Sequence, residues 1–250
     1  HWRSPDDLDQ VLARNRLPDG CPLLLLFDEF NLTRPEYYLS RLLHHADVRG
    51  AGVPGEEVSE PGQVGALNWR GFGTLNIDDT SRPPSPKIVD RCFLLEFESV
   101  GWAALGGNTH LRLAGLPELT GLPSVPQTSA ASVDQRIVRV TDELRSVVDG
   151  KHLRQDLLPS RRVMADIARV LALHHEMGEA GEQLVSRTEV VDRLIASRIL
   201  VKLSGAYEQV KDTITAVETA TKEEDGLVRT RRRLRIAASQ KSLGFVSPWQ

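Results

Sequence analysis

The sequence predicts an α/β region followed by an all-helical region. Residues 1–125 alternate short apolar runs with connections rich in glycine and proline, whereas residues 126–250 carry apolar residues at helical spacing almost throughout. Within the first region, residues 23–27 form a short, continuous apolar run, which is typical of a strand covered on both faces in a parallel sheet. We therefore expect two domains, a parallel-sheet domain at 1–125 and a helical domain at 126–250.

The positions of proline and glycine divide the first region into its predicted elements. Pro35 suits the first turn of a helix, and the leucines and tyrosines after it recur at helical spacing. A segment rich in glycine and proline follows at 49–65 and predicts a loop or hairpin. Residues 69–76 and 91–98 are the next two strand candidates, and 113–126 breaks regular structure repeatedly, as a linker does.

The second region predicts four helices. The sequence Ser132-Val133-Asp134-Gln135 fits a capping box at the start of the first. A second helix is expected at about 161–173, a third from about Thr188, and a fourth through 206–220. The residues expected to face the core of the first three helices are Val133, Ile137, Val140, Leu144, Val147, Val163, Met164, Ile167, Val170, Leu171, Val191, Leu194, Ile195, Ile199 and Leu203.

Composition narrows the classes of function. The net charge is −3, so the molecule as a whole is not a polycation that holds nucleic acid unaided. The chain has two cysteines, Cys21 and Cys92, without CxxC spacing, which favours a reducing compartment and argues against a disulfide framework or a zinc cluster. We see neither a signal peptide nor an apolar run near the roughly 20 residues of a membrane helix. These features predict a cytoplasmic location and no membrane partner.

Polar residues at the ends of two predicted strands suggest a site for a Mg²⁺-bound nucleoside triphosphate. Asp28 and Glu29 directly follow the apolar run, Asn76 ends the next strand candidate, and Asp90-Arg91 comes before the third. In open α/β sheets the ligand crevice lies at the carboxyl ends of the strands. An aspartate there can order the hydration shell of Mg²⁺ on a nucleoside triphosphate, a glutamate can polarise the attacking water, and an amide can hold that water.

Four segments resemble successive signatures of one family, the McrB-like AAA+ nucleoside triphosphatases. They are LLLLFDEFNLTRPEYYLSRLL, GTLNIDDTSRPPSPKIVDRCFLLEF, ILVKLSGAYEQV and the terminal GFVSPW. The resemblance spans nearly the whole chain. It implies a partial AAA+ parallel-sheet core with a helical lid, in the motor subunit of a modification-dependent restriction system. It further implies Mg²⁺ and GTP or ATP as ligands, a hexameric ring, a McrC-like nuclease partner, and DNA contacted through other domains or that partner.

The resemblance also implies individual roles. Asp28 and Glu29 match the Walker B pair, with Asp28 binding Mg²⁺ through water, and Asn76 matches the sensor-1 asparagine. Arg91 falls where the family has its arginine finger, which is supplied to a neighbouring subunit. Arg162 resembles the sensor-2 arginine, with Arg161 as the alternative. Asp79 matches the aspartate of an MNxxDR signature.

The chain departs from the family pattern in three places. Thr80 replaces the arginine of the MNxxDR signature and Leu75 replaces its methionine, which leaves the choice between GTP and ATP open. No GxxxxGK[ST] motif occurs in the 250 residues. Because the first residues resemble the family's segment after the second core strand, we expect the phosphate-binding loop upstream of His1.

Two other functions fit parts of the pattern. One is a MoxR-like ATP-dependent remodelling chaperone, which the terminal segment favours less. The other is an AAA+ subunit that assembles without hydrolysing nucleotide, which the missing phosphate loop allows.

Simpler interpretations apply to single residues. Arg91 could be a surface ion-pair partner of Asp90. The pairs His44-His45 and His174-His175 are more easily read as exposed histidines near helix ends than as metal ligands. The basic run at 229–235 is most simply a solvated or partner-docking face.

Overall fold

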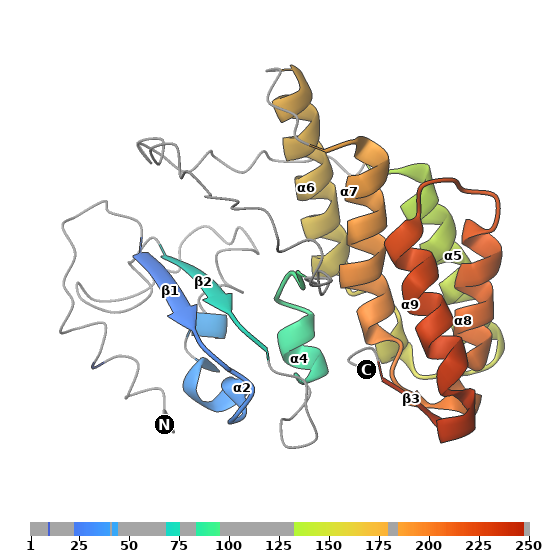
Figure 1. The fold of residues 1–250 in the computed structure, drawn as a ribbon, viewed down its shortest axis with the longest axis horizontal. Helices are drawn as coiled ribbons and strands as arrows, with labels where there is room; N and C mark the ends of the chain where they lie inside the picture. The colour runs from blue at the N-terminus through green and yellow to red at the C-terminus, as the bar shows by residue number, and fades with distance from the viewer. Residues whose placement is uncertain are drawn as a thin grey trace, which may run out of the picture.

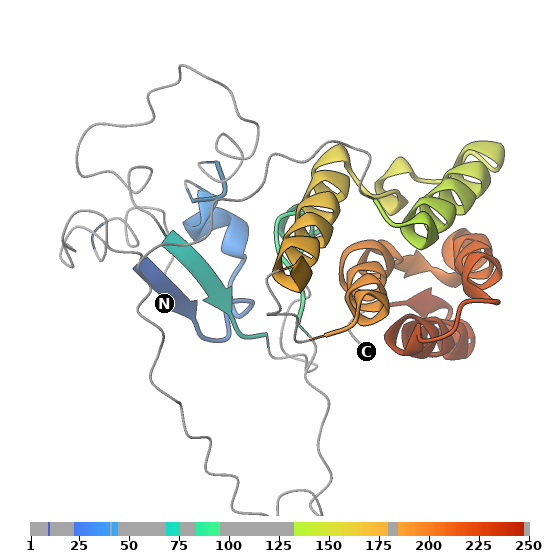
Figure 2. The same cartoon turned by 90° about the horizontal axis from the view of Figure 1, so that it is seen from above.

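The computed structural model describes residues 10, 23–40, 42–44, 69–75, 84–95, 133–179 and 185–247. They form a two-stranded sheet with short helices beside it and a larger bundle of helices (Figures 1 and 2). The predicted linker, the loop at 49–65, Asn76, Asp79 and Thr80 lie outside the described residues. No helix in the described part of the chain combines the length and apolar character needed to cross a membrane.

The sheet pairs β1 (Leu23–Phe27) with β2 (Trp69–Gly73) in parallel. Their register aligns Leu23 with Trp69 and Phe27 with Gly73, so both strands end at the same edge. The pairing continues past the strands, because Thr74 donates its backbone N–H to Phe27 O at 2.9 Å. Residues 28 and 74 therefore follow their strands side by side, and the remainder of the predicted parallel sheet stays a prediction.

Within the described part of the chain, a hydrophobic cluster packs against one face of β1. Leu25 and Phe27 contact a small hydrophobic cluster, the N-terminal cluster, which consists of Tyr38, Leu39, Leu42, Leu43 and Ile88. Leu24 and Leu26 on the opposite face are 62% and 75% exposed. The expectation that both faces are covered is therefore wrong for this strand as described, because the described helices lie against one face alone.

Two short helices each contribute one residue to the N-terminal cluster. Helix α2 (Pro35–Tyr38) begins with Pro35 in its first turn, as the sequence predicts. It places Tyr38 in the cluster, where its ring packs against Phe27 of β1. The Tyr38 hydroxyl donates to Phe30 O at 2.9 Å, and burial, followed by the charge of Glu36, raises the pKa of Tyr38 to about 12. Helix α4 (Pro86–Val89), capped by the Ser85 side chain, contributes Ile88.

The bundle contains four longer helices and irregular segments. The helices are α5 (Gln135–Gly150), α6 (Arg161–Glu179), α8 (Tyr207–Thr221) and α9 (Val228–Ser239), with the shorter α7 (Arg187–Leu194) between them. Helix α7 continues through a π-helical turn, η5 (Ile195–Ile199), and a 3₁₀ turn, η6 (Leu200–Lys202). A further 3₁₀ turn, η4 (Gln155–Leu157), joins α5 to α6, and η7 (Gln240–Leu243) follows α9. The two-residue strands β3 (Gly205–Ala206) and β4 (Phe245–Val246) pair antiparallel.

The bundle core largely matches the predicted helical faces. Ile137, Val163, Val191 and Ile199 are completely buried. Val148, rather than Val147, is the buried valine at the end of α5. This position is eleven residues after Ile137, close to three full helical turns, so it falls back on the same face.

The first helix of the bundle begins differently from its predicted capping box. Asp134 is the N-cap of α5, with its carboxylate accepting from Arg136 N at 3.1 Å. Ser132 lies outside the described residues. Asp134 also pairs with the side chains of Arg136 and Arg187, at 2.9 and 3.1 Å. A carboxylate with two cationic partners satisfies the helix start better than the box, which would place the cap two residues earlier.

Helix α9 also starts on a carboxylate, supplied by another helix. Asp192 of α7, 1% exposed, accepts from the backbone N–H groups of Arg229 and Thr230, each at 2.8 Å. These two N–H groups have no partner within their own helix, because they lie in its first turn. The basic run is therefore helical and is anchored at its first turn to the core of the bundle.

Candidate functional site

Asp28 and Glu29 follow β1 directly and make a tight turn there. Glu29 has a left-handed backbone, with φ of 46°. Its N–H donates to Thr74 Oγ1 at 2.7 Å, and Thr74 Oγ1 donates to Asp28 Oδ1 at 2.6 Å. The Thr74 hydroxyl is therefore shared between the backbone of one acid and the carboxylate of the other.

A glycine allows this turn to close. After the acid pair the chain folds back so that Phe30 N donates to Thr74 O at 3.0 Å. A Cβ on Gly73 would lie 2.9 Å from the Phe30 ring, closer than side-chain carbons normally approach. Gly73 thus permits the Phe30 ring to lie over the end of β2, which keeps the acid pair turned toward Thr74.

The acid pair is open to solvent. Asp28, Glu29 and Thr74 are all exposed. Among the residues that the structure describes, no group of three or more His, Cys, Asp and Glu side chains could hold a metal ion. One carboxylate and one hydroxyl, both oxygen donors, suit Mg²⁺, which keeps most of its water and takes few protein ligands. The donor set at this edge therefore fits a water-bound Mg²⁺ and is unsuited to zinc.

The second group of predicted residues lies around the end of α4. Asp90 ends this helix, and Arg91 follows with its N–H donating to Ile88 O at 2.9 Å. The Arg91 side chain donates to Lys87 O at 2.9 Å. Residues 91–95 are not a strand, contrary to the strand predicted at 91–98, and the remainder of that range lies outside the described residues.

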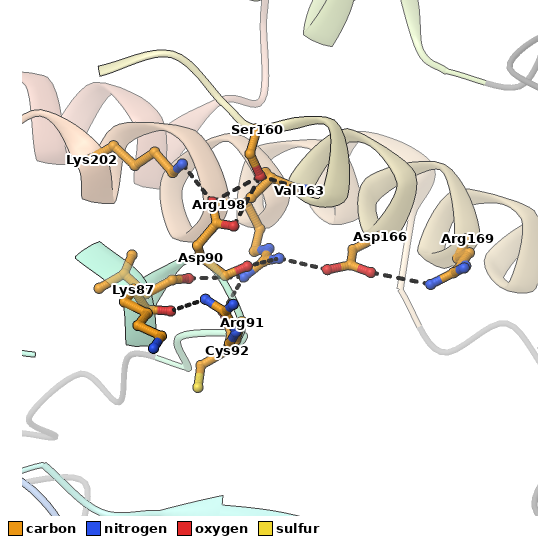
Figure 3. Close-up of polar contacts among 11 residues, drawn as sticks. Lys87, Asp90, Arg91, Cys92, Ser160, Val163, Asp166, Arg169, Arg198 and Lys202 are labelled. Atoms are coloured by element: carbon orange, nitrogen blue, oxygen red, sulfur yellow. Dashed lines mark hydrogen bonds and ion pairs between the residues drawn. The ribbon is translucent and has the colours of Figure 1, made fainter. Parts of the chain in front are cut away.

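The ion-pair partner of Asp90 comes from the bundle. Lys202 Nζ donates to Asp90 Oδ1 at 2.7 Å, and Ser160 Oγ lies 2.9 and 3.0 Å from the two carboxylate oxygens (Figure 3). Burial by itself raises the pKa of Asp90. Hydrogen bonds from Lys202 and Ser160, with the charges of Lys202 and Arg162, outweigh burial and hold that pKa below its usual value.

Arg162 lies in the first turn of α6, partly buried. Its charge favours the ionised forms of both Asp90 and Asp166. The structure thus brings Arg91 and Arg162 to the same neighbourhood at the junction of α4 and α6.

A buried arginine that sequence reasoning missed completes this junction. Arg198, on the π-helical turn, has a fully buried side chain. It donates to Val89 O at 3.1 Å, to Asp90 O at 3.2 Å and to Cys92 O, and it pairs with Asp166 at 2.8 Å (Figure 3). Its guanidinium carbon also lies 4.5 Å from the centre of the Phe93 ring.

At this junction, burial and the neighbouring charges shift the pKa values of Arg198 and Asp166 in opposite directions. Burial lowers the pKa of Arg198, and the carboxylates of Asp166 and Asp90 act against that shift. Burial raises the pKa of Asp166, against the charges of Arg198, Arg169 and Arg162. The side chain of Arg198 is fully buried and that of Asp166 is 21% exposed, so the contacts of Arg198 must compensate for removing its charge from water.

The histidine prediction is wrong in part. His174 is 8% exposed and lies within α6, where its Nε2 lies 2.9 Å from Val185 O. His175 is exposed, as expected, and lies 3.5 Å from Glu179 one turn later. The hydrogen bond gives His174 a structural explanation, because it ties α6 to the segment before α7.

Comparison with family models, with curated proteins and with solved structures found no match to this chain.

Proposed function

We propose that this chain is part of a Mg²⁺-dependent nucleoside triphosphatase, a motor resembling McrB that acts in the cytoplasm in DNA restriction with a nuclease partner. The observation that carries the proposal is the carboxyl edge of β1 and β2. Two acids there follow one strand, and Thr74 of the parallel neighbour bonds to the first of them. This is the kind of edge where open α/β sheets bind their ligands.

Each predicted site residue has a role in this proposal. Asp28, oriented by Thr74, holds water of the magnesium shell, and Glu29 accepts the proton of the attacking water. Asn76 holds that water in line, and Asp79 contacts the nucleotide. When bound, Mg²⁺ neutralises charge on the β- and γ-phosphates of GTP or ATP.

The two arginines act on the phosphates. Arg91 neutralises charge on the γ-phosphoryl group of a neighbouring subunit in a ring, and Arg162 contacts the nucleotide from the helical domain. Charge supplied in this way accelerates hydrolysis by roughly 10³–10⁵. Arg91 is partly exposed on the turn that follows α4, which supports delivery to another subunit.

The test compares Glu29→Gln with Glu143→Gln, an exposed glutamate on α5. The proposal requires a phosphate-binding loop from outside the 250 residues, so the protein is expressed from its whole gene. Glu29→Gln should bind nucleotide normally and lose hydrolysis by at least about 100-fold, because it removes the proton acceptor. Glu143→Gln should hydrolyse normally.

Two outcomes count against the proposal. Unchanged turnover in Glu29→Gln removes this residue from catalysis. Failure of the wild-type protein to bind Mg²⁺-nucleotide, together with a gene that encodes no phosphate-binding loop ahead of His1, supports the subunit that assembles without hydrolysis.

A further inference from the structure

Residues of the bundle bind the turn at 89–92 at its backbone carbonyls and at the side chain of Asp90. Arg198 binds the backbone, since it donates hydrogen bonds to three carbonyl oxygens of this turn. Lys202 and Ser160 account for the Asp90 carboxylate. We call these three bundle residues the clamp.

The contacts of Arg198 require an arginine. A planar guanidinium presents several N–H groups in fixed directions and can bond to separate carbonyls while pairing with a carboxylate. One terminal nitrogen of Arg198 donates to Val89 O and Cys92 O, and the other donates to Asp90 O and Asp166. A lysine ammonium has three N–H groups on one nitrogen and cannot satisfy these four acceptors. The last carbonyls of a helix have no partner within it, so Arg198 also completes the end of α4.

The π-helical turn explains how the side chain reaches this position. Residues 195–199 widen the helix that starts at α7, and Arg198 lies on that widened turn. Such turns are uncommon and are often found at functional positions. The residue is nevertheless fully buried, so its charge serves the interior of the molecule rather than its surface.

The carbonyls held by Arg198 lie on both sides of Arg91. Its N-terminal neighbours contribute Val89 O and Asp90 O, and its C-terminal neighbour contributes Cys92 O. The backbone of Arg91 is thereby fixed relative to α6 and the α7 extension, while its own side chain bonds to Lys87 O on α4 (Figure 3).

We propose that Arg198 is a positioning residue for Arg91, so that the helical bundle, through the clamp, sets where the Arg91 guanidinium lies. A movement of the bundle then moves Arg91 with it. The effect on hydrolysis rests on the proposed function, whereas the mechanical claim does not.

The mechanical claim is tested by amide hydrogen exchange in a peptide spanning residues 86–95. The variants are Arg198→Lys and Lys202→Met, and the control is Arg193→Met, which removes an exposed arginine of the same helix from a surface pair with Glu189. Each clamp variant should speed exchange of this peptide roughly tenfold, because hydrogen bonds from charged groups are lost. Exchange in α5 and α8 should stay unchanged, and the control should match wild type.

The catalytic consequence is tested by a double-mutant cycle in the protein expressed from its whole gene. Lys202→Met should lower kcat about tenfold or more with KM unchanged, and adding it to Arg91→Ala should cause no further loss. Additive losses would mean that Lys202 acts independently of Arg91.

The outcomes separate the two proposals. Unchanged exchange at 86–95 in Lys202→Met overturns the clamp even where Arg198→Lys fails to fold. Faster exchange with normal hydrolysis in Arg91→Ala retains the clamp and rejects the catalytic role of Arg91.

Discussion

At the scale of single residues, the candidate edge depends on a hydroxyl rather than on the acids alone. Thr74 donates to Asp28 and accepts from the backbone of Glu29. These two bonds fix the orientation of one carboxylate and the left-handed backbone of the other residue. A left-handed conformation costs a non-glycine residue about 1 kcal/mol or more, so its retention here depends on the surrounding bonds.

Thr74→Val keeps the shape of the side chain and removes both bonds. If Asp28 binds a magnesium-bound water, the variant should lower magnesium-dependent hydrolysis by roughly 10- to 100-fold, the usual effect of removing the partner of a metal-binding group. Thr74→Ser retains the hydroxyl and should keep most of the activity. The measurement is the Mg²⁺ concentration dependence of turnover. Equal activity in both variants would show that the hydroxyl does not orient Asp28.

At the scale of elements, the sequence predicts well what depends on local pattern. Helices α5, α6, α7 and α8 appear close to their predicted ranges, because apolar spacing acts within one element, whereas α9 was not among the four predicted helices. The misses depend on distant partners. Asp134 caps α5 with help from Arg187, which is 53 residues away in the chain. No local sequence pattern predicts that contact.

The candidate site divides in the same way. The position of Asp28 and Glu29 after a strand could be predicted from the apolar run that precedes them. Thr74 could have been found from the register of two parallel strands, had that register been known. Arg198 could not, since its contacts with the turn at 89–92 join residues more than 100 positions apart and the π-helical turn that places it has no simple sequence signal.

The start of α5 gives a prediction about pH. Hydrogen bonds from Arg136, opposed by burial, lower the pKa of Asp134 from 3.8 to about 2 in the folded protein. A lowered acid pKa stabilises the fold above the unfolded value, and this contribution disappears as pH falls through the folded value. Asp134→Asn can still cap the helix but lacks the charge, so it should lower the free energy of unfolding by roughly 2 kcal/mol at pH 7.

The difference between Asp134→Asn and wild type should shrink between about pH 4 and pH 2 and vanish below that window. Urea unfolding followed by circular dichroism measures it. The control is Asp142→Asn, whose side chain is 63% exposed in a surface pair with Arg145 and should change stability little at any pH. A constant difference across the pH range would show that the charge of Asp134 is not responsible.

At the scale of the whole molecule, two hydrophobic clusters are joined through one short helix. Helix α4 inserts Ile88 into the N-terminal cluster, and its last residues are held by the clamp from the bundle. Figures 1 and 2 show α4 between the sheet and the bundle. Helix α4 therefore contacts the N-terminal cluster through an apolar side chain and contacts the bundle through hydrogen bonds and an ion pair. The two contacts depend on different forces.

This division can be tested by weakening only the apolar side. Ile88 is 1% exposed, and Ile88→Ala should cost about 2–5 kcal/mol in the contacts of the N-terminal cluster. Because the bundle has its own core, we expect the loss to appear as faster amide exchange and proteolysis within residues 23–44, while circular dichroism still reports a folded bundle. The converse variant, Leu144→Ala, empties a fully buried position in the bundle core and should lower the melting temperature of the helices. If Ile88→Ala instead unfolds the helices in the same transition, the two clusters form one cooperative unit, and α4 serves as part of a continuous core rather than as a link between two.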